Sequence, residues 1–183
     1  MENFSNNFLL SMPHLNDSIF GESLIYICTH DSSGAMGIII NKPMPPKNID
    51  NILKETGLEQ LKPTLNIYFG GPVDIEIGMF LHNYHYKTKG TISISKSISL
   101  SSNINIIKDI KNGKGPEKFK FALGYAGWGE GQLEAELENG DWLLIPSDDD
   151  LIFNIDHTRI LQKVKSLIDI DINNFSGGLS GIS

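Results

Sequence analysis

The stretch GYAGWGEGQLEAELENGDW, from Gly124 to Trp142, says most about the fold, because it contains a corner, a helix and the start of a strand. The helix is predicted by Leu133 and Leu137, which lie four residues apart, and by Asn139-Gly140, a common C-terminal stop. The preceding corner is rich in glycine, which permits positive φ and close backbone approach. Such a corner is either a packed turn or a place where free N–H groups at the helix start bind a ligand.

Outside this stretch, hydrophobic periodicity predicts alternating short strands and helices. A hairpin is expected around Gly34, and three consecutive isoleucines in its second arm indicate a strand covered on both faces. Another pair of strands is expected to meet at the Gly-Gly-Pro turn, 70–72. The expected strands cover 23–30, 35–41, 64–71, 77–82, 91–100, 118–127 and 141–146, and the expected helices cover 48–57, 103–113, 131–140 and 156–168.

Two of these elements carry more specific expectations. The alternation of isoleucine and serine over 91–100 predicts one strand with a solvated face and Lys96 near its middle. The helix over 103–113 is expected to bury Ile104, Ile107 and Ile110.

Length and composition favour one soluble globular domain. The chain has 183 residues, of which 40% are hydrophobic and 20% charged, and it contains no repeat or interdomain linker. The fold class predicted is α+β, with residues 173–183 as a flexible tail.

Charge and cysteine content narrow the class of protein further. The net charge of −7 argues against direct nucleic-acid binding, and the lysines between Lys108 and Lys120 are interpreted as a solvated face. The lone Cys28 excludes an intramolecular disulfide and favours a reducing compartment. No signal peptide or membrane-spanning run is recognisable, so a cytoplasmic protein with no membrane partner is expected.

Four blocks resemble the AlgH/YqgE family of small bacterial proteins. They are FLLSMPHLNDSIF, SLIYICTHDSSGAMGIIINKP, YFGGPVDIEIGMFLH and LGYAGWGEGQLEAELENGDWLLIP, in the family's order and over nearly the whole chain. The resemblance implies a single domain over residues 1–183, with coiled, partly bifurcated antiparallel sheets and flanking helices. It also implies a regulatory role, since the family's name derives from an association with regulation of alginate genes, and it supplies no catalytic residues.

The glycine corner is the leading candidate site. The dinucleotide fingerprint fails because Gln132 occupies the position of its third glycine, and no cofactor is predicted. Glutamates in the first turn disfavour a phosphate and favour a cationic or neutral ligand, or a basic segment of a partner. We expect the loops 41–43, 70–72 and 126–132 to converge there. The candidate ligand- or partner-binding residues are Asn41, Gly70, Gly71, Tyr125, Trp128, Gln132 and Glu134.

Cys28 and His30 form the main alternative, because two residues at positions i and i+2 of a strand point to the same face. Such a pair activates a thiolate only if the thiol is exposed, whereas an apolar run precedes Cys28 and favours a buried structural role. No metal site is predicted. His82 and His85 lack a third ligand, and Asp148–Asp150 fit a helix cap better than a calcium loop.

The sequence therefore favours a non-enzymatic cytoplasmic regulatory or interaction protein with an unknown protein or small-molecule partner. The alternative is an enzyme of unknown class, hydrolase-like or thiol-dependent through Cys28.

Overall fold

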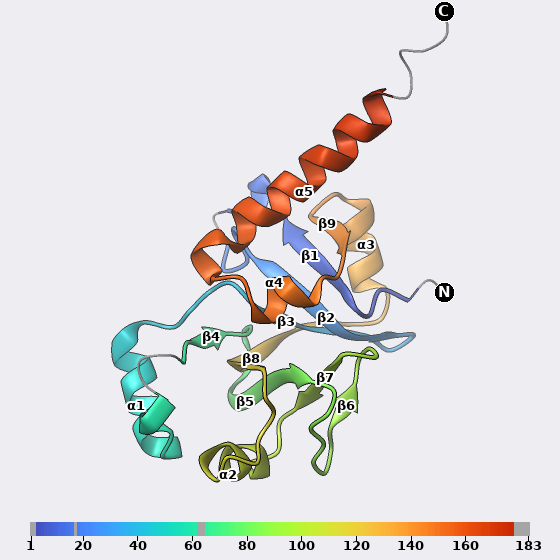
Figure 1. The fold of residues 1–183 in the computed structure, drawn as a ribbon. Coiled ribbons are helices and arrows are strands. Elements are labelled where there is room, and N and C mark those ends of the chain that lie inside the picture. Colours follow the sequence, from blue (N-terminus) through green and yellow to red (C-terminus); the bar gives the residue numbers. More distant parts are fainter. Residues whose placement is uncertain (1–2, 17, 62–64, 178–183) are drawn as a thin grey trace, which may run out of the picture.

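The structure, a computed structural model, describes residues 3–16, 18–61 and 65–177. Nine strands form one continuous sheet in the order β6-β7-β5-β8-β3-β2-β1-β9, and β4 pairs with β8 outside that path (Figure 1). The strands are β1 (Asn7–Ser11), β2 (Leu24–Asp31), β3 (Gly34–Ile39), β4 (Ile67–Phe69), β5 (Val73–Asn83), β6 (Ile92–Ser93), β7 (Ile98–Ser101), β8 (Phe119–Trp128) and β9 (Trp142–Pro146).

Helices flank this curled sheet on several sides, and the α+β class is confirmed. The α-helices are α1 (Pro46–Thr56), α2 (Asn105–Lys111), α3 (Gln132–Glu138), α4 (Asp149–Phe153) and α5 (His157–Gly177), and the 3-10 turns are η1 (Pro13–Leu15) and η2 (Glu59–Leu61). The described residues contain no helix that is both long and apolar enough to cross a membrane.

Strand β8 belongs to both halves of the sheet. Its first half pairs in parallel with β4 and antiparallel with β5, so that Phe121 lies opposite both Ile67 and Phe80. Its second half pairs with β3, placing Trp128 opposite Ala35. This change of partner is the bifurcation that the family resemblance implied.

The chain changes partner at Gly124, which has φ +69. There the ladder with β5 shifts, because residues 74–77 of β5 bulge out between Val73, opposite Tyr125, and Gly78, opposite Leu123. A Cβ on Gly124 would lie 2.5 Å from the carbonyl oxygen of Gly71 and 2.8 Å from that of Val73. Glycine is therefore required both by the left-handed backbone and by the approach of β5.

The predicted hairpin at the Gly-Gly-Pro turn is wrong in its pairing, because β8 is inserted between its arms β4 and β5. The turn crosses the backbone of β8, where a Cβ on Gly71 would lie 2.1 Å from the carbonyl carbon of Tyr125. Local hydrophobicity identified the two strands but carried no information about the third strand that separates them.

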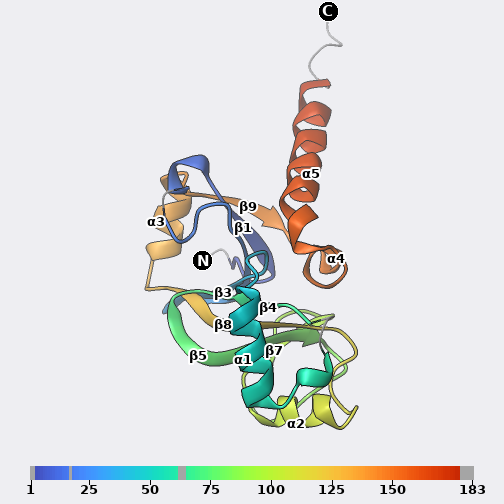
Figure 2. The ribbon, with the colours of Figure 1, turned by 90° about the vertical axis from the view of Figure 1, so that its left-hand side faces the viewer.

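The three isoleucines of the second hairpin arm, Ile38–Ile40, are fully buried, as predicted, and β2 is buried on both faces as well. Leu24 and Tyr26 pack with α4 and α5 on one face, and Ile25 and Ile27 pack on the opposite face with Leu133 of α3. Figure 2 shows α3 and α5 on opposite sides of the sheet. A third cluster joins α1 and α2 to β4, β5 and β8 at the other end of the molecule.

Several sequence-based boundaries need correction. Residues 91–100 form two short strands, β6 and β7, because Ile94 and Ser95 turn the chain back through N–H bonds to the carbonyl of Ile98. Lys96 therefore lies in a turn. Helix α2 begins at Asn105 and buries Ile106, while Ile104 is 63% exposed.

Three further elements complete the comparison with the sequence-based boundaries. Strand β1, which periodicity did not predict, lies between β2 and β9. Helix α1 begins at Pro46, two residues before the expected cap, and ends as predicted at left-handed Gly57. Helix α5 runs to Gly177, so residues 173–177 of the expected flexible tail are helical, and residues 178–183 lie outside the described part of the chain.

The partner change in β8 makes Gly124→Ala a severe substitution. We expect a loss of about 3–5 kcal/mol of unfolding free energy, because positive-φ strain adds to a backbone clash. Gly113→Ala is the matched control, since Gly113 has φ +67 but a Cβ there would meet no atom within 4 Å, and it should lose only about 1–2 kcal/mol. Denaturant titration of both variants measures the difference, and equal losses would contradict the role given to Gly124.

Candidate functional site

Glu136 joins the two tryptophans of the chain. Its Oε2 accepts hydrogen bonds of 2.8 Å from Trp128 Nε1 and of 2.8 Å from Trp142 Nε1. Its Oε1 accepts a bond of 2.9 Å from Gln132 Nε2. The indole rings lie 6.1 Å apart at 80°. One carboxylate therefore ties the end of β8, the helix α3 and the start of β9 together.

Local sequence explains how these three side chains meet. Trp128 is the last residue of β8, and Gly131, with φ 67, turns the chain into α3. Gln132 supports that turn, because its Oε1 accepts a bond of 3.0 Å from Gly129 N–H. Glu136 then follows Gln132 by one helical turn, so their side chains share a face.

A pocket of about 210 Å³ opens beside this cluster. Leu15, Phe20 and both tryptophans give it apolar walls, and Glu136 and Asp141 are its acidic members. The ring of Phe20 lies 5.7 Å from that of Trp142, at 76°. The tryptophans are mostly buried, with 7% and 5% exposed, so they belong to the core and to the pocket wall at once.

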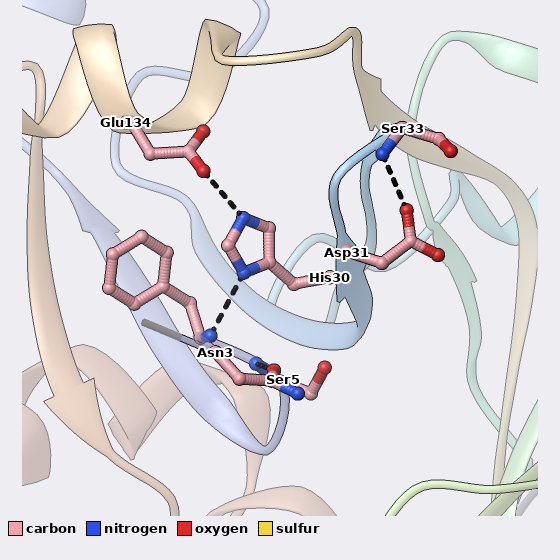
Figure 3. Close-up of polar contacts among 7 residues, drawn as sticks. Asn3, Ser5, His30, Asp31, Ser33 and Glu134 are labelled. Carbon is pink, nitrogen blue, oxygen red and sulfur yellow. Dashed lines mark hydrogen bonds and ion pairs between the residues drawn. The ribbon is translucent and has the colours of Figure 1, made fainter. Parts of the chain in front are cut away.

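Of the predicted site residues, Trp128 and Gln132 line this pocket, whereas Glu134 is directed elsewhere. Glu134 Oε1 lies 3.0 Å from His30 Nε2 (Figure 3). His30 Nδ1 accepts a bond of 3.1 Å from Phe4 N–H, so the ring proton lies on Nε2 and is donated to the carboxylate. The Phe4 ring stacks on the imidazole at 4.8 Å. This pair fastens the N-terminal segment and α3 to β2.

The other predicted site residues have structural partners. Asn41 accepts a bond from Leu24 N–H and donates one to the carbonyl of Glu22, each of 2.8 Å. Gly70 and Gly71 pack against the backbone of β8. Tyr125 donates a bond of 3.2 Å to Asp74.

The expected convergence of the three loops is seen only in part, because the loop 70–72 meets both of the others while 41–43 and Trp128 lie apart. Trp128 lies opposite Ala35 at the start of β3, while Asn41 lies six residues further along the extended chain, about 20 Å away. The loop at 70–72 lies next to both segments: the Gly70 carbonyl accepts a bond of 2.9 Å from Ile39 N–H, and a Cβ on Gly71 would lie 2.3 Å from Ala126 N. Strand β3 therefore separates 41–43 from Trp128.

Sequence reasoning did not assign Phe20, Glu136, Asp141 and Trp142 to the site. From the sequence, Trp142 is expected only to cover the edge of the core. Glu136 is expected only to add negative charge to the first turn of the helix. A signal was present in the i, i+4 spacing of Gln132 and Glu136 between two tryptophans. Nothing in the sequence indicated that Phe20, more than a hundred positions away, would complete the wall.

The expectation that Cys28 and His30 point to the same face is wrong, whereas the favoured burial of Cys28 is confirmed. A β-bulge shifts the register between Ile27 and Thr29, which moves His30 to the face of α3 and leaves Cys28 in the opposite core. The thiol is 2% exposed, and its Sγ lies 3.6 Å from the carbonyl oxygen of Tyr26. Burial raises the pKa of Cys28, so the thiolate is disfavoured.

A second buried group resembles part of a hydrolase site. His82 Nδ1 lies 2.9 Å from the carbonyl of Asn83, so Nε2 accepts a bond of 2.9 Å from the Ser101 hydroxyl. Thr91 Oγ1 lies 2.8 Å from Ser101 Oγ. Because His82 is fully buried and Ser101 is 1% exposed, we interpret this network as structural. Burial lowers the pKa of His82.

Lys120 is the remaining buried ionisable side chain of interest. Its Nζ donates a bond of 2.9 Å to the carbonyl of Ile40 and lies 4.2 Å from the centre of the Tyr68 ring. Burial lowers the pKa of Lys120 to about 8.

Among the residues that the structure describes, no group of three His, Cys, Asp or Glu side chains could hold a metal ion. Asp148 caps α4 by accepting a bond from Asp150 N–H, as predicted.

Burial of Cys28 predicts a thiol that is unreactive in the folded protein. We expect the chain's single cysteine to react with a disulfide reagent at least ~100-fold more slowly in the native protein than in guanidinium chloride. Spectrophotometric thiol titration at several pH values measures both rates. A native thiol that reacts at the rate of the unfolded chain would restore the thiol-dependent hypothesis.

Burial of His82 predicts a specific loss of stability in acid. Its pKa is lower in the folded than in the unfolded chain, where it is about 6.5, so the unfolded state binds the proton first as the pH falls. Unfolding free energy should therefore decrease below about pH 6.5 more steeply in the wild type than in His82→Gln. His85→Gln, at an exposed histidine, is the matched control. Denaturant titrations between about pH 7 and 5 test this, and parallel curves for wild type and His82→Gln would refute it.

Comparisons with known proteins agree with this architecture. The AlgH-like family model matches residues 8–173. The chain is 39% identical over 180 residues to a UPF0301 protein of Marinomonas sp. (strain MWYL1), covering 96% of this chain and 94% of that protein. It is 38% identical over 181 residues to a UPF0301 protein of Agrobacterium fabrum (strain C58 / ATCC 33970), covering 94% and 90%.

Two solved structures are similar. The solution structure of the AlgH protein from Pseudomonas aeruginosa has a TM-score of 0.77 and 32% identity, covering 99% of this chain and 96% of that one. A crystal structure of a Corynebacterium diphtheriae protein, with a TM-score of 0.67 and 20% identity, covers 90% of this chain and 86% of that one and shares the fold. With a family model that spans most of its length, this chain belongs to the AlgH-like family.

Proposed function

We propose that this AlgH-like protein is a non-enzymatic interaction protein that acts in the cytoplasm in a regulatory role. The regulatory role rests on the family resemblance, and the cytoplasmic location on the lone cysteine, which favours a reducing compartment. The partner surface is the pocket formed by Phe20, Trp128 and Trp142 beside Glu136, called here the tryptophan pocket.

The main support for this proposal is the composition of the pocket. Tryptophan and other aromatic side chains contribute much of the binding energy at protein interfaces, and here they form the wall of a pocket on a rigid support. Glu136 and the core cluster hold both indoles in place, so little conformational entropy is lost when a partner binds.

The groups that could perform chemistry lie elsewhere or are occupied. The Cys28 thiol and the Ser101 hydroxyl are buried away from the pocket. Ser18 does line the pocket, but its hydroxyl donates to the carbonyl of Leu15 and accepts from Phe20 N–H. It therefore stabilises a turn, and no histidine is among the described residues that line the pocket and could activate it. Binding accounts for the pocket better than catalysis does.

The charge of the pocket also bears on the class of partner. Glu136 and Asp141 repel phosphate, and the whole chain carries −7. A protein partner therefore fits this surface better than nucleic acid.

A photo-crosslinking amino acid at Ser18 tests this proposal in living cells. Ser18 is exposed and lines the pocket, and exposed Lys114, which follows α2 at the other end of the molecule, is the matched control position. We expect a discrete protein adduct from position 18 but not from position 114. In a Phe20→Ala background the adduct should fall at least ~5-fold, with folding verified by circular dichroism. Adducts that are absent at position 18, or identical at both positions, would reject the tryptophan pocket as the partner surface.

A further inference from the structure

We propose that the tryptophan pocket receives the ammonium end of a lysine side chain from the partner protein. This inference rests on the function proposed above and names the chemistry that the site recognises. Three properties of the pocket carry it: an uncompensated negative charge, aromatic walls and a matching size.

The negative charge of Glu136 has no cationic counterpart among its hydrogen-bond donors. All three of these bonds come from neutral groups of described residues, two indoles and one amide. The donors hold the carboxylate in a fixed orientation but leave its full charge. Asp141 adds a second carboxylate, which lies 2.7 Å from the exposed imidazole of His14. Neither lysine nor arginine occurs among the described residues that line the pocket.

The walls suit an alkylammonium group. Phe20, Trp142 and Trp128 follow one another at 5.7 and 6.1 Å, with neighbouring ring planes 76° and 80° apart. At such steep angles none of these neighbouring rings stack face to face, and all three line the pocket. The negative face of an aromatic ring attracts a cation, most strongly for tryptophan. The apolar stem of lysine would pack on the same rings and on Leu15.

Size and charge together favour a lysine side chain over neutral and anionic occupants. The pocket of about 210 Å³ is comparable to an engineered cavity of about 150 Å³ that binds the six carbons of benzene. A lysine side chain has five heavy atoms beyond Cα and fits this space. A neutral alkyl group would fill the same space but would remove water from the carboxylate without replacing it, which costs free energy. A phosphate would meet two carboxylates.

Intrinsic fluorescence provides a direct test, because both tryptophans of the chain line the pocket. The probes are N-acetyl-lysine methylamide and N-acetyl-norleucine methylamide, which share the alkyl stem and differ in the ammonium group. We expect saturable quenching by the lysine probe and at least ~10-fold weaker binding of the norleucine probe. The preference should decrease as salt is raised, because it is electrostatic.

Glu136→Gln should weaken binding of the lysine probe at least ~10-fold. Glu138→Gln, which removes the same charge from an exposed position on the same helix, is the matched control and should change binding less than about twofold. The amide of Glu136→Gln retains an acceptor for the indoles, and thermal melting verifies its fold. If that variant does not fold, the two probes and the salt titration on the wild-type protein still test whether the pocket binds the ammonium group.

Equal binding of the two probes would overturn the lysine inference while leaving the pocket as a binding site. Absence of quenching by either probe up to tens of millimolar would also overturn it. The proposed function itself is judged by crosslinking at position 18, which does not depend on the chemistry of the probe.

Discussion

The fold depends on one strand that serves two sets of partners. Strand β8 pairs with β4 along its first half, with β3 along its second half, and with β5 from Phe119 to Tyr125. This exchange needs a backbone without side chains at Gly71 and Gly124, where the strands approach more closely than a Cβ allows. Because β8 is fixed by both halves of the sheet, the position of its last residue, Trp128, is fixed as well.

The candidate site is a consequence of this arrangement. Trp128 at the end of β8 and Trp142 at the start of β9 flank α3, and the carboxylate of Glu136 accepts a hydrogen bond from each indole. A buried edge of the core thus becomes a rigid aromatic wall, and η1 with the loop after it supplies the opposite side through Leu15 and Phe20. Architecture and the proposed recognition use the same side chains here.

The polar groups buried elsewhere maintain the fold in a different way. His30 joins β2 to the N-terminal segment and α3, His82 joins β5 to β7 through Ser101, and Lys120 joins β8 to the carbonyl of Ile40. Each has a hydrogen-bond partner, as buried polar groups require. Unlike Glu136, they do not line the tryptophan pocket, which is why we assign recognition to the pocket alone.

The sequence determined the α+β class, the hairpin β2–β3 buried on both faces, the helix α3 and its stop, and two pocket residues, Trp128 and Gln132, because these depend on local periodicity and turn chemistry. Only the tertiary structure decided that β8 enters between β4 and β5 and that Phe20 completes the pocket, since both are contacts between distant segments. It also decided the face of His30, because a single bulged residue at Cys28 reverses the alternation that any sequence pattern assumes.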